Sequence, residues 1–217
     1  MAVIAVALFI SACSVFGGKA AKEPGYRVLL EDSGIEIREY ETYAVAWTTA
    51  PGSFDEAVET GFQRLFEYIT GGNVGATDID MTATVLTEPE TLKAAAIVAE
   101  PERRNDDSGP TALAGPSIGG WSISFVLPAG YTAETAPVPK SADVSIGDVA
   151  ARCVASIRFS GALGEEAGEV ERQSLERWLG ARDLEHAGDW QIAGYNSPWT
   201  IPMLRRNEVL VGLRSYP

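Results

Sequence analysis

Apolar and polar residues alternate along residues 26–50, which is the pattern of strands that bury one face. The tripeptide Asp-Ser-Gly at 32–34 interrupts this alternation with residues that favour a tight turn. We therefore expect a hairpin at this turn, followed by a further strand. The apolar positions that keep the period of two are Ile35, Ile37, Tyr43, Val45 and Trp47.

After residue 52 the period of two gives way to the period of a helix. Ser53 and Glu56 form a capping-box sequence, in which the serine caps the helix start and the glutamate reaches back to it. Gly71 and Gly72 predict the helix end. The apolar face of this predicted helix consists of Phe54, Val58, Phe62, Leu65, Phe66 and Ile69.

A second amphipathic helix is predicted over residues 165–181, and short apolar runs predict the remaining strands. The apolar face of the second helix consists of Val170, Leu175, Trp178 and Leu179. The strands are predicted at 79–87, 93–99, 121–127, 144–146, 153–159, 190–195 and 208–214. The Gly- and Pro-rich stretches 100–120 and 197–207 predict loops.

The two halves of the chain resemble each other. When the first half is aligned with the second at an offset of about 109 residues, four apolar residues match: Ile35, Ile37, Val45 and Ala46 align with Val144, Ile146, Val154 and Ala155. A shift of about 110 places Leu65, Tyr68 and Ile69 on Leu175, Trp178 and Leu179. A period this long excludes a solenoid. It predicts an α+β domain of two fused copies that share one sheet or barrel, with the helices outside.

The first residues have the pattern of an export signal. Residues 2–10 are all apolar, a run too short to span a bilayer as a helix but suited to a signal peptide over 1–12. The run ends in Ile10-Ser11-Ala12-Cys13, which resembles a lipobox whose cysteine receives the lipid. Residues 13–25 then form a flexible tether, and 26–217 the domain.

This interpretation of the N-terminus places the protein on the periplasmic side of a bacterial cell envelope, bound to a membrane through lipid on Cys13. Ser14, directly after it, favours sorting to the outer membrane. The segment lacks the usual basic residues before its apolar run. A plain cleaved signal and a buried N-terminal segment remain the alternatives.

Composition narrows the classes of function. The chain has 46% hydrophobic and 22% charged residues, the mixture of a globular protein with a core. Its net charge of −13 repels a polyanion, which argues against nucleic acid as a partner. With one histidine and two cysteines the chain has too few ligands for a conventional zinc centre. Nucleophilic catalysis needs a base beside the nucleophile, and the one histidine lies in a predicted turn, so we expect a binding protein and not an enzyme.

Five segments resemble the SOUL haem-binding-protein family, over about residues 26–213. They are 35–47 (IEIREYETYAVAW), 61–73 (GFQRLFEYITGGN), 79–85 (IDMTATV), 121–132 (WSISFVLPAGYT) and 195–211 (YNSPWTIPMLRRNEVLV). The resemblance implies two pseudo-repeats that form a twisted eight-stranded antiparallel sheet or open barrel flanked by two long helices. It also implies binding of haem or a related tetrapyrrole in an apolar cleft against the first helix.

The residues expected to hold a tetrapyrrole lie on that helix and in the Pro-rich loop. Phe62 and Phe66 stand one turn apart and are expected to cover one face of the ring, with Trp199, Met203 and Met81 as further apolar contacts. Arg64 is the expected partner of a propionate. Ordinary core packing, or for Arg64 a solvated helix face, is the alternative for each.

The sequence lacks the histidine that some family members use as an axial ligand of the haem iron. Family members that use a histidine near the end of the first strand pair differ from this chain, which has Tyr40, Tyr43 and Ala44 there. Thr84 also replaces the proline of the family's methionine-threonine-alanine-proline-valine motif. The remaining residues able to ligate iron are His186, expected in a turn, together with Cys153, Tyr40, Tyr43, Tyr195 and Met81, and packing is the alternative for these.

Two hypotheses follow. The first is an envelope-anchored carrier or scavenger of haem, in which Arg205 and Arg206 satisfy backbone carbonyls or Glu208 rather than bind ligand. The second is a generic module for a small molecule or a protein partner, related to the effector-binding domains of bacterial regulators, which have similar folds.

Overall fold

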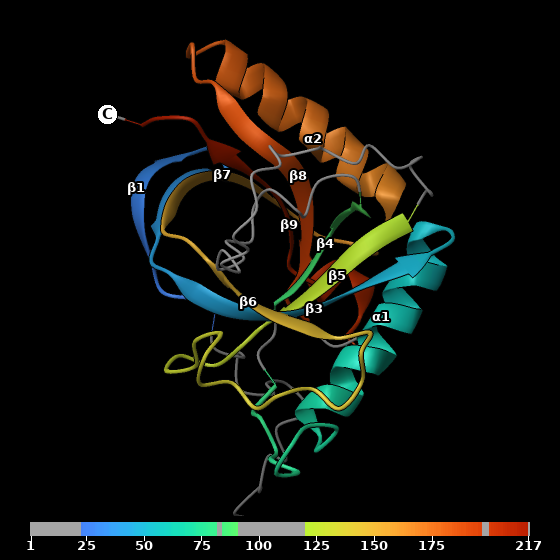
Figure 1. Cartoon of the computed structure of the whole chain (residues 1–217). Coiled ribbons are helices and arrows are strands. Elements are labelled where there is room, and N and C mark those ends of the chain that lie inside the picture. Colours follow the sequence, from blue (N-terminus) through green and yellow to red (C-terminus); the bar gives the residue numbers. More distant parts are fainter. Residues whose placement is uncertain (1–22, 82–83, 91–119, 197–199, 217) are drawn as a thin grey trace, which may run out of the picture.

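A single curved antiparallel sheet with two helices on its outer side makes up the structure (Figure 1). This computed structural model describes residues 23–81, 84–90, 120–196 and 200–216. The elements are β1 (Tyr26–Asp32), β2 (Ile35–Tyr40), β3 (Tyr43–Pro51), α1 (Phe54–Ile69), β4 (Val85–Pro89), β5 (Gly120–Val126), β6 (Ser145–Val149), β7 (Arg152–Phe159), α2 (Glu165–Gly180), β8 (His186–Gly194), the short 3-10 helix η2 (Pro202–Leu204) and β9 (Asn207–Leu213).

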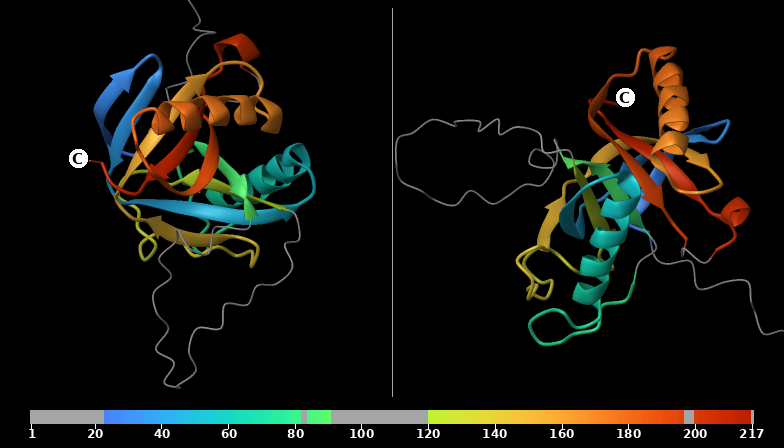
Figure 2. Two further views of the ribbon diagram at one scale, coloured as in Figure 1. Left: turned by 90° about the horizontal axis from the view of Figure 1, so that it is seen from above. Right: turned by 90° about the vertical axis from the view of Figure 1, so that its right-hand side faces the viewer.

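The strands lie in the order β1-β2-β7-β9-β8-β4-β5-β3-β6, so the expected α+β class is confirmed. Within the described ranges the sheet has nine strands, one more than the eight expected, because residues 26–32 form an edge strand paired with β2. That the two halves are copies of each other stays a prediction. α1 packs against β3 and β5, and α2 against β7, β8 and β9, so each helix covers a different part of the convex face (Figure 2).

The predicted turn at 32–34 joins β1 to β2. Ser33 and Gly34 have φ of +52° and +83°, the left-handed conformation that a two-residue hairpin loop requires. Strand pairing begins directly beside this turn, where Asp32 is opposite Ile35. The sequence prediction of a hairpin here is confirmed.

Helix α1 begins where the capping box predicts. The backbone N–H and the hydroxyl of Ser53 both donate to Glu56 Oε2, at 3.0 and 2.8 Å. The helix ends at Ile69, and Gly71 follows with φ of +98°. Four predicted face residues differ in outcome: Phe54, Leu65 and Ile69 are buried, whereas Phe66 is 44% exposed.

Helix α2 matches its predicted range but not its whole predicted face. Leu175 and Leu179 are buried against the sheet, as expected. Val170 is 59% exposed, so its assignment to the apolar face was wrong. The reason is that α2 meets the sheet through Gly168 and the two leucines, which leaves Val170 on the solvent side.

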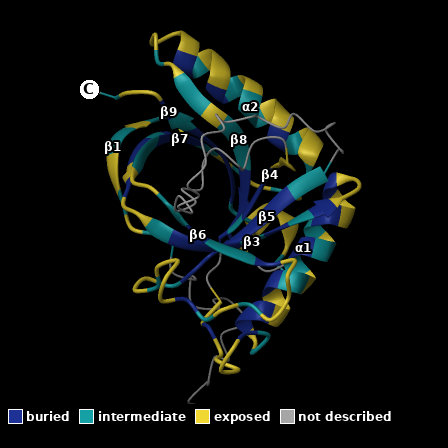
Figure 3. Cartoon of the chain, viewed as in Figure 1, coloured by how far each residue is buried: buried dark blue, intermediate teal, exposed yellow. Residues whose placement is uncertain are grey.

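Three apolar clusters form the core, two under the helices and one on the inner side of the sheet (Figure 3). Alternation along each strand separates them. Ala44 and Ala46 of β3 lie in the cluster under α1, while Val45 between them lies in the inner cluster. On β9, Val211 lies under α2 and Leu210 in the inner cluster. The curvature of the sheet thus creates an inner side where several strands converge.

Two strand predictions need correction. Residues 79–81 are not in a strand, because Ile79 N–H donates to the Ile69 carbonyl and ties this stretch to the end of α1, and β4 begins only at Val85. His186, expected in a turn, is the first residue of β8. The predicted strand 93–99 and the loop 100–120, apart from Gly120, lie outside the described residues.

The predicted signal peptide (1–12), Cys13 and most of the tether also lie outside the described residues. Within the described ranges, no helix has the length and apolar character needed to cross a membrane.

Candidate functional site

An aromatic pair on α1 is partly packed against the sheet and partly exposed. The rings of Phe62 and Phe66 are stacked with centroids 5.9 Å apart and planes 10° from parallel. Phe62 also meets the buried Phe125 of β5 edge-on at 5.3 Å, which fixes its ring against the sheet. Phe66 is 44% exposed. The pair therefore presents a flat apolar surface that is anchored beneath and open above.

The other predicted contact residues do not all gather around this pair. Met81 is 45% exposed, on the stretch that follows α1. Arg64 turns towards the sheet, where it donates to the Thr49 carbonyl at 2.9 Å and to the Thr48 hydroxyl at 3.3 Å. These contacts give Arg64 a structural function in addition to any contact with a propionate.

The Pro-rich loop lies beside the segment that leads into α2. Within η2, Met203 is 80% exposed. The Pro202 carbonyl of this short helix accepts a hydrogen bond from Gly161 N–H. Trp199 lies outside the described residues.

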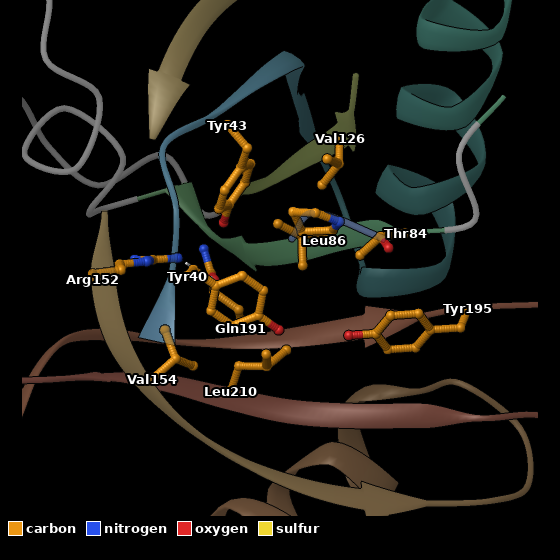
Figure 4. A pocket seen from close by; sticks show the side chains of 11 residues that line it. Tyr40, Tyr43, Thr84, Leu86, Val126, Arg152, Val154, Gln191, Tyr195 and Leu210 are labelled. Atoms are coloured by element: carbon orange, nitrogen blue, oxygen red, sulfur yellow. Dashed lines mark hydrogen bonds between the residues drawn. The ribbon is translucent and has the colours of Figure 1, made fainter. Parts of the chain in front are cut away.

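The three tyrosines weighed as iron ligands meet in one cavity on the inner side of the sheet (Figure 4). The space inside is about 10 Å³, enough for roughly one water molecule. The residues that line it are Pro24, Tyr40, Tyr43, Thr84, Leu86, Val126, Arg152, Val154, Gln191, Tyr195 and Leu210. Sequence reasoning had named the tyrosines but had no signal that they would converge.

A buried ionic network lies beside the cavity, centred on the fully buried Glu208. Arg38 donates to both of its carboxylate oxygens, at 2.6 and 2.9 Å. Arg206 donates to Oε1 through two nitrogens, at 2.9 and 2.6 Å, and the Tyr195 hydroxyl donates to Oε2 at 2.8 Å. Burial acts to raise the pKa of Glu208, but these arginines outweigh it and hold the pKa below its usual value.

The predicted roles of Arg205 and Arg206 are confirmed by this geometry. Arg205 Nε donates to the Thr200 carbonyl at 2.8 Å. Arg206 pairs with Glu208 and also with Glu23, a residue of the segment before β1. These contacts give the most distinctive motif of the sequence a structural function.

Haem does not suit the tyrosine cavity. Room for about one water excludes a porphyrin, because sites for drug-sized ligands span roughly 300–1,000 Å³. Burial raises the pKa of Tyr40 to about 12, against the opposing charge of Arg38, and raises that of Tyr195 well above its usual value. Both shifts disfavour the phenolate in the protein without iron. A tetrapyrrole of the expected kind would therefore need a wider site than this cavity.

Two other residues considered as iron ligands, His186 and Cys153, lie on β8 and β7. His186 lies 5.2 Å from the Trp190 ring, and Cys153 packs with the cluster under α2. In the described part of the chain, no three His, Cys, Asp or Glu residues are grouped to hold a metal ion.

An open groove of about 680 Å³ lies where the N-terminal ends of α1 and α2 approach each other. Phe54 and Leu163 are among its apolar lining. The polar part of the groove lining includes the carboxylates of Asp55, Glu165, Glu166 and Glu169. These charges repel propionates, so the groove suits haem less well than the Phe62–Phe66 face.

Comparison with known proteins agrees with the sequence resemblance. The profile of the family described as SOUL heme-binding protein matches residues 21–212. Heme-binding protein 1 of Xenopus laevis is 28% identical over 199 residues, which cover 90% of this chain and 93% of that protein.

Two solved structures share the fold at low identity. The C-terminal domain of EcmrR has a TM-score of 0.55 at 8% identity, over 88% of this chain and 99% of that one. A structure titled as a hydrolase from Listeria innocua has a TM-score of 0.50 at 9% identity, over 85% and 94%. At these identities the likeness concerns the fold alone.

Proposed function

The chain belongs to the SOUL heme-binding protein family, and we propose that it binds haem or a related tetrapyrrole on the outer face of α1. The family supports a binding protein rather than an enzyme. Phe62 and Phe66 are the residues proposed to stack on the ring, with Met81 as a further apolar contact.

The observation that carries this proposal is that the exposed ring of Phe66 stacks on the ring of Phe62, which is itself fixed against the sheet. Phe62 is held by Phe125, and Phe66 stacks parallel to it, so the pair is ordered before any ligand arrives. A porphyrin is a flat apolar plate, and offset stacking on an ordered aromatic surface recovers apolar area at little entropic cost. Bound haem would supply an iron centre. The cavity lined by Tyr40 and Tyr195 has room for about one water molecule, which supports binding in which neither ligates the iron.

A haem titration followed at the Soret band tests the proposal. Residues 20–217 contain every described element and are the form to use. We expect a saturable shift at one haem per chain. Phe66→Ser should weaken binding about ten-fold, since burying part of a phenylalanine contributes roughly 1–2 kcal/mol. The matched control is Val170→Ser, an exposed apolar residue on the other helix, which should bind haem as the unchanged chain does.

A flat titration of the unchanged chain would remove haem as the ligand. An equal loss in the Phe66 and Val170 variants would remove α1 as the site. The flat titration would favour the alternative function, a generic module for another small molecule or a protein partner. The likeness of its fold to the EcmrR domain is compatible with that alternative.

We further propose that lipid on Cys13 holds the protein at the bacterial envelope, on the periplasmic side, as a carrier or scavenger. The lipobox sequence at 10–13 supports this, and the net charge of −13 supports a role without nucleic acid. Cys13→Ala should move the protein to the soluble fraction and remove the mass of the lipid. Retention in the membrane without a change in mass would contradict the anchor.

We also propose that the domain consists of two duplicated halves. Apart from β1, the strand order is unchanged when β2, β3, β4 and β5 are exchanged with β6, β7, β8 and β9 and the list is reversed. Such an order supports a two-fold relation between the halves.

A further inference from the structure

The inner cavity has polar groups without partners at two places. Thr84 is 2% exposed, and its hydroxyl has no hydrogen-bond partner among the described residues. The same holds for the buried Nε of Arg152. Both residues line the cavity, and Figure 4 shows them at opposite ends with Tyr40 and Leu86 between. Buried polar groups are nearly always paired in native proteins, so two unpaired groups facing one space indicate a site for a ligand.

Among the described residues, Arg152 has no anionic partner. Its described hydrogen bond goes to a neutral group, the Oε1 of Gln191, at 3.1 Å. Gln191 in turn donates from Nε2 to Glu88 at 2.8 Å, which fixes the amide so that its oxygen faces the arginine. The two other arginines nearby, Arg38 and Arg206, are both committed to Glu208. Arg152 is therefore the cation at this cavity that can pair with an anion.

The walls between the two polar ends are apolar and aromatic. Leu86, Val126, Val154 and Leu210 are buried in the inner cluster, together with the ring of Tyr40. Such walls favour a flat or branched hydrocarbon body over a sugar or a phosphate ester. The lining therefore matches a ligand with one acidic end and a short apolar body.

Four of the lining residues are only partly buried and mark the entrance. They are Pro24, Tyr43, Arg152 and Gln191, whereas the other lining side chains are buried. Because the cavity has room for about one water, a ligand needs Pro24 and Tyr43 to move outward. Pro24 belongs to the segment before β1, which is held by the Glu23–Arg206 pair and by Glu41 N–H donating to the Gly25 carbonyl. Opening the entrance at Pro24 therefore has to shift these two contacts.

We propose that this cavity is a second binding site, separate from the α1 face, for a small aromatic carboxylate. Arg152 at the entrance pairs with the carboxylate, the tyrosine and aliphatic walls enclose the ring, and the Thr84 hydroxyl at the far end hydrogen-bonds a polar substituent of the ring.

Calorimetric titration of residues 20–217 with benzoate and with benzamide, its neutral analogue, tests the site. We expect benzoate to bind saturably and benzamide at least about ten-fold more weakly, because a hydrogen bond to a charged group contributes roughly 1.5–3 kcal/mol. Arg152→Met should weaken benzoate to the level of benzamide. Arg158→Met, which changes an exposed arginine on the same strand, should leave benzoate binding unchanged.

The far end of the cavity is tested with 4-hydroxybenzoate. We expect it to bind more tightly than benzoate, and Thr84→Val should abolish that difference. Equal binding of benzoate and benzamide by the unchanged chain, or no saturable benzoate binding, would overturn the proposal even if a variant failed to fold. Independence from the haem site requires that Arg152→Met keeps the Soret shift and that Phe66→Ser keeps benzoate binding.

Discussion

Arg38 and Glu208, which are 170 positions apart in the sequence, form a two-bond ion pair with side chains 3% and 0% exposed. The pair joins β2 to β9 across the intervening strand β7. A buried ion pair recovers its desolvation cost only when further hydrogen bonds satisfy the charges, and here Arg206 and Tyr195 provide them. The network therefore favours the observed arrangement of β2, β7 and β9, because burying either Arg38 or Glu208 without the other would leave a charge without a partner.

Glu208→Gln should destabilise the fold by about 3–5 kcal/mol, the usual cost of leaving a buried charge without its partner. The amide keeps the shape but cannot neutralise Arg38 and Arg206. The free energy of unfolding in urea measures the effect. Glu169→Gln is the matched control, because it removes a carboxylate paired with Arg172 on the exposed surface of α2. We expect that control to unfold like the unchanged chain, and a similar loss in both variants would contradict the special position of Glu208.

The carboxylate of Glu208 should also make the stability of the fold sensitive to acid. The arginines lower its pKa in the folded state relative to about 4.3 in an unfolded chain. A lowered folded pKa means that this contribution to stability is present above pH 4.3 and is lost as the pH falls through the folded pKa. Urea unfolding between pH 7 and pH 2 should therefore show a loss of stability below about pH 4.3. The loss should be smaller in Glu208→Gln, and parallel pH profiles of the two chains would refute this.

Alkaline titration should reveal the buried phenols of the inner side. Burial raises the pKa of Tyr40 to about 12, from about 10 in an unfolded chain. Because the folded pKa is the higher one, the contribution of Tyr40 to stability is present below pH 10 and is lost as the pH rises through 12. Absorbance at 295 nm should show a late ionisation step, and Tyr40→Phe should reduce its amplitude. Superimposable curves above pH 11 would exclude Tyr40 as a late-ionising group.

Local patterns in the sequence predicted the elements but not their partners. α1 was predictable because its capping box, its apolar period and its terminal glycines all lie within 20 neighbouring residues. The Arg38–Glu208 pair was not, because it depends on the order of strands in the sheet. That Thr84 and Arg152 line one cavity was hidden for the same reason, since the two reach it from different parts of the sheet.

The strand at His186 shows a second limit of local patterns. The pairing of β8 with β9 shifts register between Ala187 and Trp190, and Gly188 has φ of +75° within this bulge. A bulge adds a residue to one strand and breaks the period of two. The stretch therefore has the composition of a turn although it pairs with β9. The sequence does not show which residues of an apolar helix face stay exposed. Phe66 lies on the predicted face of α1 and is 44% exposed, because the helical period predicts which residues align but not where the sheet beneath them ends.

Close packing of α1 on the sheet depends on Gly61, one residue before Phe62. A Cβ atom at this position would lie 2.7–2.8 Å from Cγ1, Cβ and Cδ1 of Ile123, a residue of β5 with 0% exposure. The Cβ of Ile123 cannot move without its strand, so the contact cannot be relieved by rotating the side chain. Gly61→Ala should therefore cost about 1–3 kcal/mol from overpacking, more than the roughly 1 kcal/mol that alanine adds in helix propensity.

The control is Gly180→Ala at the end of α2, where no atom lies within 4 Å, and it should be neutral or slightly stabilising in thermal unfolding. If Gly61→Ala proved as stable as the unchanged chain, α1 would not be seated closely on β5, and the ordered Phe62–Phe66 surface proposed to bind haem would lose its support.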